Sequence, residues 1–192
     1  MKYIGKNVRI STGVYFQNPE YISIDDNCWI DMNVSILAGL DSSKREKIII
    51  KNEAYKGEKG VVHIGKNVHV GIGCIISGIS AGVYISDNCG LSAQSKIYSL
   101  CHHYQSKKDP TNKEIYFSPL VPQKNQCIIE GAVTLGLNTG VALNSVILPG
   151  VSIPENCFVA INAVVRPGDY RNNSILSGNP AERVGDRFES NE

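Results

Sequence analysis

The sequence lacks the features of several other classes of protein. No apolar run reaches the roughly 20 residues that span a bilayer, and the opening MKYIGKNVRI has no apolar core of a signal peptide. The formal net charge is only +1 over 192 residues, which gives no electrostatic reason to expect nucleic acid as a partner. We therefore expect a cytoplasmic protein with no membrane span and no nucleic-acid partner.

Charged residues are also scarce, at 19% of the chain, whereas 42% of the residues are hydrophobic. This balance argues against extended disorder. A chain of this length can bury a substantial core as one unit. We expect a single domain over residues 1–192.

Aliphatic residues recur with a spacing of six. Nineteen positions follow this spacing, and all of them are Ile, Leu or Val. The series comprises residues 4, 10, 24, 30, 36, 64, 70, 76, 79, 85, 91, 97, 129, 135, 141, 147, 153, 159 and 165. A helix would give a period of 3.6 and an ordinary strand a period of 2, so neither explains the pattern.

A second column of compact residues, mostly Val, Ser, Thr and Ala, lies four positions after each aliphatic. All six cysteines share its phase: Cys28, Cys74, Cys89, Cys101, Cys127 and Cys157. A free cysteine packs like a small buried hydrophobe, so we interpret the six as structural thiols in a reducing compartment rather than as three disulfides. One large and one small inward residue in every six predict a coil of three short parallel strands, with residues eighteen apart on neighbouring coils about 4.8 Å apart. The handedness of the coil does not follow from the period.

Several segments carry a family resemblance: IGKNV, ISDNCGLSAQSKIYSLCHHY, VILPGVSIPENCFVAINAVV and the later SGNPAERV. They resemble the hexapeptide-repeat acyltransferases, in particular the sugar O-acetyltransferase branch with its galactoside and maltose acetyltransferases. The resemblance implies an all-β, left-handed parallel β-helix, a homotrimer, and acetyl-CoA bound between adjacent subunits. It also implies acetyl transfer to a hydroxyl of a sugar, of a surface polysaccharide or of a precursor such as a sugar nucleotide.

Two lapses in the period predict loop excursions, over about residues 37–61 and 99–126, and a short C-terminal extension follows from about residue 167. The first excursion carries six cations against four acids. We interpret it either as a solvated hairpin or as a flap that contacts an acidic acceptor or a phosphate. The second excursion has the length of a lid or binding loop and begins with two adjacent histidines.

His102 is our candidate general base. Attack on a thioester requires the acceptor to lose a proton, and a histidine titrates near neutrality and can take it. In the relatives the catalytic histidine follows the strand before the long loop, which matches His102, with His103 as second choice. A sulfur nucleophile at Cys101 is disfavoured, because its place in the small column turns it inward.

The resemblance places the pantetheine arm of acetyl-CoA along the coils after the second excursion. The implied contacts are Gly140, Ala142, Ala160 and Ile161, with Arg166 and Arg183 near the 3′-phosphate. We expect no metal. His63 and His69 are six residues apart and should lie on adjacent faces of the coil, which does not match the histidine spacing of the zinc-dependent γ-class carbonic anhydrases.

Two other functions remain open. An N-acetyltransferase acting on a nucleotide-linked amino sugar would use an amine acceptor and a carboxylate to orient the histidine, and Glu130 is the candidate carboxylate. A β-helix trimer that has lost turnover would be a binding or scaffold protein. Binding of acetyl-CoA separates the enzymes from the scaffold.

Overall fold

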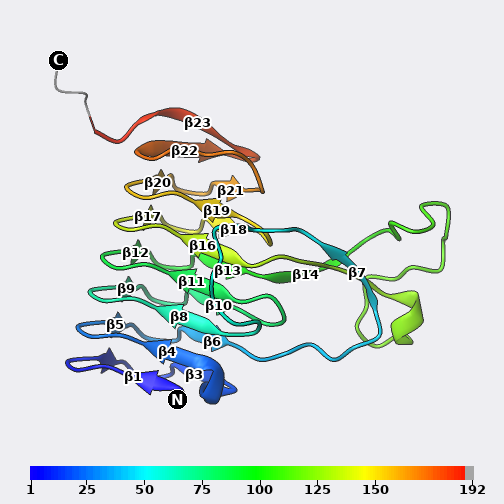
Figure 1. The fold of residues 1–192 in the computed structure, drawn as a ribbon, viewed down its shortest axis with the longest axis horizontal. Coiled ribbons are helices and arrows are strands. Elements are labelled where there is room, and N and C mark those ends of the chain that lie inside the picture. The colour runs from blue at the N-terminus through cyan, green and yellow to red at the C-terminus, as the bar shows by residue number, and fades with distance from the viewer. Residues whose placement is uncertain (189–192) are drawn as a thin grey trace.

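The computed structural model describes residues 1–188, and in it the chain winds into a stack of coils with three parallel sheets as its sides (Figure 1). Neighbouring strands in each sheet come from successive coils. Ile24 pairs with Ile4 and with Ile64, for example, so that each core position repeats one coil further along. The all-β parallel β-helix predicted from the period of six is confirmed.

The strands divide into four sheets across residues 1–188. The first sheet comprises β1 (Tyr3–Ile4), β4 (Ile22–Ile24), β8 (Val62–Ile64), β11 (Val83–Ile85), β16 (Val133–Leu135) and β19 (Ser152–Ile153). The second sheet comprises β2 (Arg9–Ile10), β5 (Trp29–Ile30), β9 (His69–Val70), β12 (Gly90–Leu91), β17 (Gly140–Val141), β20 (Phe158–Val159), β22 (Ser174–Gly178) and β23 (Ala181–Asp186). The third sheet comprises β3 (Tyr15–Gln17), β6 (Ser35–Leu37), β10 (Ile75–Ser77), β13 (Lys96–Tyr98), β18 (Val146–Ile147) and β21 (Val164–Val165). A small fourth sheet comprises β14 (Leu100–His103), β15 (Cys127–Glu130) and β7 (Glu46–Ile49), and two 3-10 turns cover Pro19–Tyr21 and Gln123–Asn125.

The core is the inside of the coil. The large aliphatic column is fully buried through the middle coils, as at Ile30, Ile76 and Leu135, and the compact column lies beside it, as at Val68 and Ala163. The buried side chains form one continuous cluster. Alternation along each short strand produces this arrangement, because residues two apart point to the same side of a strand.

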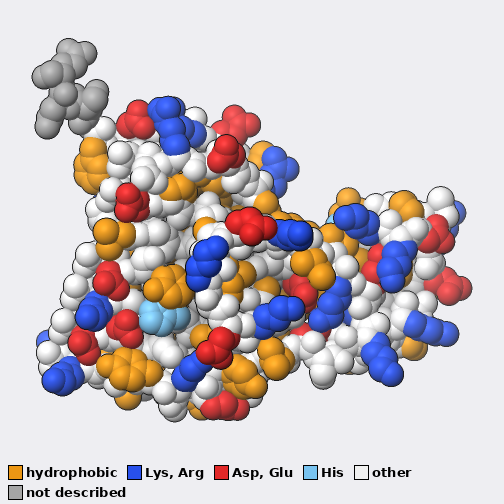
Figure 2. Space-filling model, in the orientation of Figure 1, with side chains coloured by type: hydrophobic (Ala, Val, Ile, Leu, Met, Phe, Trp, Pro, Cys, Tyr) orange, Lys and Arg blue, Asp and Glu red, His pale blue; other side chains and the backbone are white. Residues whose placement is uncertain are grey.

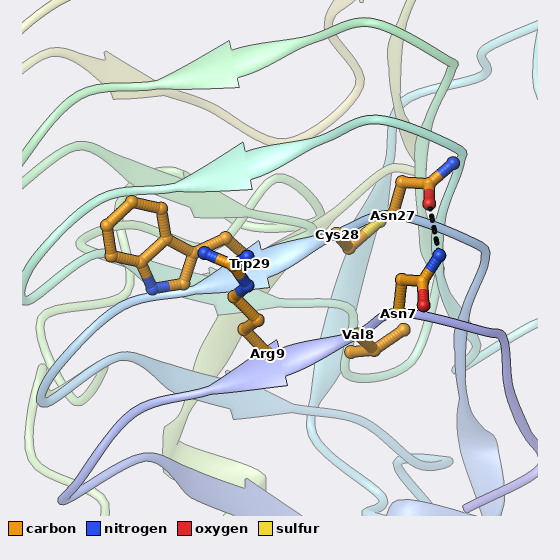
Figure 3. A pocket seen from close by; sticks show the side chains of 6 residues that line it. All are labelled: Asn7, Val8, Arg9, Asn27, Cys28 and Trp29. Atoms are coloured by element: carbon orange, nitrogen blue, oxygen red, sulfur yellow. Dashed lines mark hydrogen bonds between the residues drawn. The ribbon is translucent and has the colours of Figure 1, made fainter.

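Asparagines make the corners of the coil. The residue three positions before most core aliphatics is an asparagine in the left-handed region, such as Asn67 and Asn138, each with φ 56°. Asparagine tolerates this conformation better than most residues. Their amides stack from coil to coil: Asn7 donates to Asn27 over 3.1 Å (Figure 3), and Asn27 donates to Asn67 over 3.3 Å. The period of six contains this signal, which our sequence analysis did not use.

The two ends of the coil differ. In the first coil, Ile4 and Ile10 belong to the aliphatic column but are exposed, because no further coil covers them in the structure. At the other end, β22 pairs with β20, and β23 turns back antiparallel to β22. Residues 189–192 of the predicted C-terminal extension lie outside the described residues. In the part of the chain described, no helix has the length and apolar character that a membrane crossing requires.

Part of the predicted coil lies outside it. Ile129 and the cysteines Cys101 and Cys127 fit the period of six, but they lie on β14 and β15, which belong to the fourth sheet. The prediction that these residues line the coil is therefore wrong. The cause is that β15 pairs with both β14 and β7. The alternation of buried residues therefore continues in the fourth sheet, which lies outside the coil. All six cysteines are free thiols.

Candidate active site

Both excursions leave the coil at the same corner. The chain departs after β6 and after β13, both in the third sheet, and returns at β8 and β16, both in the first sheet. The two excursions can therefore pair: β14 runs antiparallel to β15, and β15 runs parallel to β7. This three-stranded sheet, which we call the arm, projects sideways from the stack of coils (Figure 1).

The register of the arm decides which side chains share a face. His102 lies opposite Ile128, and Ile128 lies opposite Lys47, so these three form one row across the arm. Glu130 is two residues beyond Ile128 on β15 and therefore points to the same side. We call the side that carries His102, Lys47 and Glu130 the histidine face.

His102 is half-buried on this face. Burial lowers the pKa of its imidazole, and the positive charge of Arg45 lowers it further. The ring lies 5.6 Å from the ring of Phe117, on the loop between β14 and β15. Its Nδ1 is buried and has no hydrogen-bond partner among residues 1–188. At neutral pH the imidazole is therefore uncharged and able to accept a proton.

A network of charges surrounds the histidine face. Asp41 forms ion pairs of 3.0 Å with both Arg45 and Lys47. Burial raises the pKa of Asp41, but hydrogen bonds from Ser43, Lys47 and Arg45 outweigh burial and lower the pKa to about 2. Asp41 thus stays ionised and fixes both cations beside His102. Figure 2 shows several Lys and Arg side chains over the arm, together with acidic ones.

Glu130 takes part in the same network but does not orient His102. Its Oε2 accepts a hydrogen bond of 2.5 Å from the Ser80 hydroxyl and lies 3.4 Å from Lys47 Nζ. Ser80 lies in the turn between β10 and β11, at the corner from which the arm projects. The sequence-based idea that Glu130 orients His102 is therefore not supported by the geometry, since its contacts tie the arm to the coil.

His103 and Cys101 lie on the other face of the arm, because they alternate with His102 along β14. His103 Nδ1 lies 2.8 Å from the carbonyl oxygen of Gln105, to which it can donate, and its ring stacks on Tyr104. Burial raises the pKa of the Cys101 thiol, so the sulfur is not a thiolate at neutral pH. Neither residue shares the row of His102 and Lys47.

The residues expected to bind CoA are partly brought together. Ala142 directly follows β17 and Ala160 directly follows β20, and these strands are neighbours in the second sheet. Gly140 begins β17, and Ile161 is exposed beside Ala160. Three of the six residues thus lie at one corner of two successive coils, and Gly140 lies on the strand that leads to it.

The two arginines lie in different sheets. Arg166 follows β21, in the third sheet, and is exposed. Arg183 lies on β23 and forms an ion pair of 2.7 Å with Asp186. Arg183 pairs with Leu176, and Leu176 pairs with Val159, so Arg183 lies in the second sheet two strands from the small residues, whereas Arg166 lies away from them.

His63 and His69 lie on different sheets, as their spacing predicted. His63 is in the first sheet, stacked on Tyr84 with 4.5 Å between ring centroids, and His69 is in the second sheet. Among residues 1–188, no group of three or more His, Cys, Asp or Glu side chains is arranged to hold a metal ion.

The surface has hollows both at the arm and far from it. One, of about 340 Å³, lies between the excursions and is lined by Asp41, Arg45 and Gln123 among others. A second, of about 250 Å³, lies at the base of the arm beside Glu130. A third lies on the first two coils, where Arg9 and Trp29 project from neighbouring strands of the second sheet (Figure 3). It lies on a different side of the coil from the arm.

Comparison with known proteins adds to this geometry. A dTDP-4-amino-4,6-dideoxy-D-glucose acyltransferase of Escherichia coli is 28% identical over 155 residues, which cover 80% of this chain and 66% of that protein. A point mutant of AntD, an N-acyltransferase from Bacillus cereus solved with dTDP-4-amino-4,6-dideoxyglucose and coenzyme A, superposes with a TM-score of 0.78 and 21% identity over 98% of this chain and 86% of that one. A maltose O-acetyltransferase from Clostridium difficile superposes with a TM-score of 0.52 and 21% identity over 80% of this chain and 71% of that one.

The chain is a homologue of the hexapeptide-repeat sugar acyltransferases. The structural likeness also establishes the left-handed form of the parallel β-helix, which the period alone left open. No protein-family model matches the sequence. The chain spans 66% of the length of the Escherichia coli relative.

Our sequence analysis missed the partners of the histidine face. Ser80 gave no signal, because its contact with Glu130 joins segments 50 residues apart. Asp41 and Ser43 contact the nearby Arg45, but no pattern in the sequence indicated that this group lies beside His102. Arg45 and Lys47 did give a signal, as members of the basic first excursion. Their proximity to His102 follows only from the tertiary structure, in which β7 pairs with β15 in the arm.

Proposed function

We propose that this protein transfers an acyl group from acyl-CoA to an amine of a nucleotide-linked amino sugar. The observation that carries the proposal is the uncharged His102 on the histidine face, at the corner where both excursions leave the coil. Two relatives support the acceptor class, since one is a dTDP-4-amino-4,6-dideoxy-D-glucose acyltransferase and the other was solved with dTDP-4-amino-4,6-dideoxyglucose. This acceptor was the alternative in our sequence analysis, which favoured a sugar hydroxyl.

The proposed reaction is a direct transfer from acyl-CoA to the amine, without a covalent acyl-enzyme. The amine nitrogen attacks the thioester carbonyl carbon, a C–N bond forms, the C–S bond breaks, and CoA leaves as a thiolate. His102 accepts the proton that the amine loses and returns it to the leaving sulfur. General base catalysis of this kind contributes typically about 10²–10⁴-fold to the rate. An uncharged imidazole is the form that this role requires, which is the form that burial and Arg45 favour.

Acyl-CoA is proposed to lie along the corner after the second sheet. Ala142 and Ala160 have small side chains, so a pantetheine arm can approach the backbone there, with Gly140 and Ile161 beside it. Arg166 and Arg183 remain the proposed partners of the nucleotide phosphates. Because Arg166 follows a strand of the third sheet and does not lie with the small residues, this proposal needs a second subunit to complete the site.

A homotrimer is proposed to supply that subunit. The corner after the second sheet carries an apolar ridge on successive coils, in which Met32, Ile72, Leu143 and Ile161 are 41% to 58% exposed. Backbone hydrogen bonds link the coils along this ridge, as from Asn162 N to Leu143 O. The corner before the second sheet instead carries charged side chains at most of the matching positions, such as Lys66, Asp87 and Glu155, with Leu137 as the exception. An apolar edge beside a charged one favours an interface at the apolar edge.

The trimer has a direct test. Light scattering after size exclusion should give three times the chain mass for the native protein. Leu143→Asp buries a charge in the proposed interface and should shift the protein toward the monomer. A native protein that elutes as a monomer at micromolar concentration would overturn the trimer.

The activity is tested by the release of free CoA thiol. The native protein is incubated with acetyl-CoA and either dTDP-4-amino-4,6-dideoxyglucose, dTDP-glucose or maltose. We expect release with the amino sugar and formation of an amide, identified by mass spectrometry. If no acceptor gives release but the protein binds acetyl-CoA tightly, the proposed acceptor is wrong. Absence of both release and binding would favour the scaffold function.

A sugar hydroxyl is the second candidate acceptor. It is favoured by the likeness to a maltose O-acetyltransferase and by the resemblance of the sequence to that branch. The same assay separates the two, because the ester product of a hydroxyl is cleaved by hydroxylamine and the amide product resists it.

A further inference from the structure

A small pocket lies at the base of the arm, on the histidine face. It has a volume of about 250 Å³, smaller than the roughly 300–1,000 Å³ typical of sites for drug-sized ligands, so it suits a single ring. The lining combines apolar residues with the polar Asn52 and Tyr55 and with two charged side chains, Glu130 and Lys59. The apolar part of the lining includes Ile49, Ile50, Ala81 and Ala132.

Glu130 is the buried charge of this pocket, with only 7% of the residue exposed. Its Oε2 is occupied by Ser80 and Lys47, whereas its Oε1 has no hydrogen bond within residues 1–188. Lys47 lies closer to Asp41, at 3.0 Å, than to Glu130, at 3.4 Å. Oε1 is not among the buried side-chain atoms that lack a partner in residues 1–188, so it is accessible from the pocket and can accept a hydrogen bond from a ligand.

Lys59 brings the opposite charge to the rim. Its side chain is exposed, and it forms no ion pair among the described residues. An ammonium group at the mouth of a pocket can bind the phosphate of a ligand that enters the pocket from solvent. The pocket thus offers an acceptor for N–H groups inside, apolar walls, and a cation at the rim.

We propose that this pocket binds the sugar ring of the acceptor, with Glu130 Oε1 accepting hydrogen bonds from its amine and Lys59 facing its diphosphate. This inference rests on the proposed function and adds to it the residues that select an amine over a hydroxyl. Glu130 and His102 are diagonal neighbours on antiparallel strands, a relation that places side chains about 7–8 Å apart. An amine held at Glu130 therefore lies on the face that carries the proposed base.

The test is Glu130→Gln, which keeps the shape of the side chain and removes its charge. The Michaelis constant for dTDP-4-amino-4,6-dideoxyglucose should rise about 10- to 100-fold, the usual effect of losing a hydrogen bond to a charged group. The Michaelis constant for acetyl-CoA should change by less than about 3-fold, because acetyl-CoA does not enter this pocket. Glu58→Gln is the matched control, because it removes the same charge from an exposed side chain that pairs with Lys2.

A structural role for Glu130 is separated by Ser80→Ala. This change removes the hydrogen bond that anchors Glu130 to the coil but leaves the carboxylate in place. If Glu130 binds the amine, Ser80→Ala raises the acceptor Michaelis constant far less than Glu130→Gln does. If Ser80→Ala has an equal effect, or if the constant for acetyl-CoA rises in parallel, Glu130 only holds the arm and the inference is overturned.

Lys59→Ala gives an independent measurement, since it changes an exposed side chain. It should raise the Michaelis constant for the nucleotide-linked amino sugar at least about 5-fold, a typical loss for one charge-assisted contact, and leave the constant for the free amino sugar unchanged. Equal effects on both acceptors would overturn the role of Lys59. The native protein is assayed before any variant. If it releases no CoA with any amino-sugar nucleotide, this outcome overturns the proposed function together with the inference.

Discussion

Replacing His102 by alanine is the perturbation that tests the proposed mechanism most directly. The imidazole is half-buried beside Phe117 and Arg45, and its Nδ1 makes no hydrogen bond within residues 1–188. The substitution therefore breaks no hydrogen bond of the arm at that atom. The strands β14 and β15 stay paired through their backbones, so the arm should keep its structure.

The expected loss follows from the role of the ring. Without a general base the turnover number should fall by about 10²–10⁴-fold, which corresponds to about 2.7–5.5 kcal/mol in the activation barrier. The Michaelis constants should change little, because the proposed contacts of the sugar and of acyl-CoA lie elsewhere. Steady-state release of free CoA thiol, measured at saturating substrate, gives the turnover number.

His103→Ala is the matched control. The same ring is removed from the next residue, but on the opposite face of the arm, where His103 Nδ1 interacts with Gln105. It should keep most of the turnover. If His102→Ala retains more than about a third of the native turnover, or if His103→Ala loses as much, the assignment of the base is refuted.

Three further predictions concern pH dependence and stability. Burial and Arg45 lower the pKa of His102, and only the uncharged ring accepts a proton, so turnover should fall only as the pH drops below the ordinary histidine range. Arg45→Gln should move this fall to higher pH. An unchanged profile of turnover against pH would contradict the role of Arg45. Ile85→Ala should lower the free energy of unfolding by about 2–5 kcal/mol in urea titration, because Ile85 is fully buried in a middle coil, whereas Leu137→Ala at an exposed corner should cost less than about 1 kcal/mol. Asn67→Val should lower the free energy of unfolding by about 1–2 kcal/mol more than Asn67→Gly does, because both variants lose the stacked amide but only the β-branched residue is strained at φ 56°; equal melting temperatures for the two variants would refute the corner argument.

The sequence by itself determined the coil. A period of six with a large and a small inward residue has few structural solutions, because each coil must bury the same positions against the coil before it. Ile30, Ile76 and Leu135 are buried where the period places them. The period also predicted where the chain leaves the coil, because it lapses where Leu37 and Tyr98 end their strands.

Only the tertiary structure decided what happens beyond that corner. The period alone placed Cys101 in the core, but pairing between β14 and β15 places it on the arm. The position of a strand depends on the strand to which it is hydrogen-bonded as well as on its own alternation of side chains. Glu130 could be proposed from the sequence, but its partners Ser80 and Lys47 lie 50 and 83 residues away along the chain. Contacts over such separations depend on how two excursions fold onto each other, and no local pattern in the sequence records them.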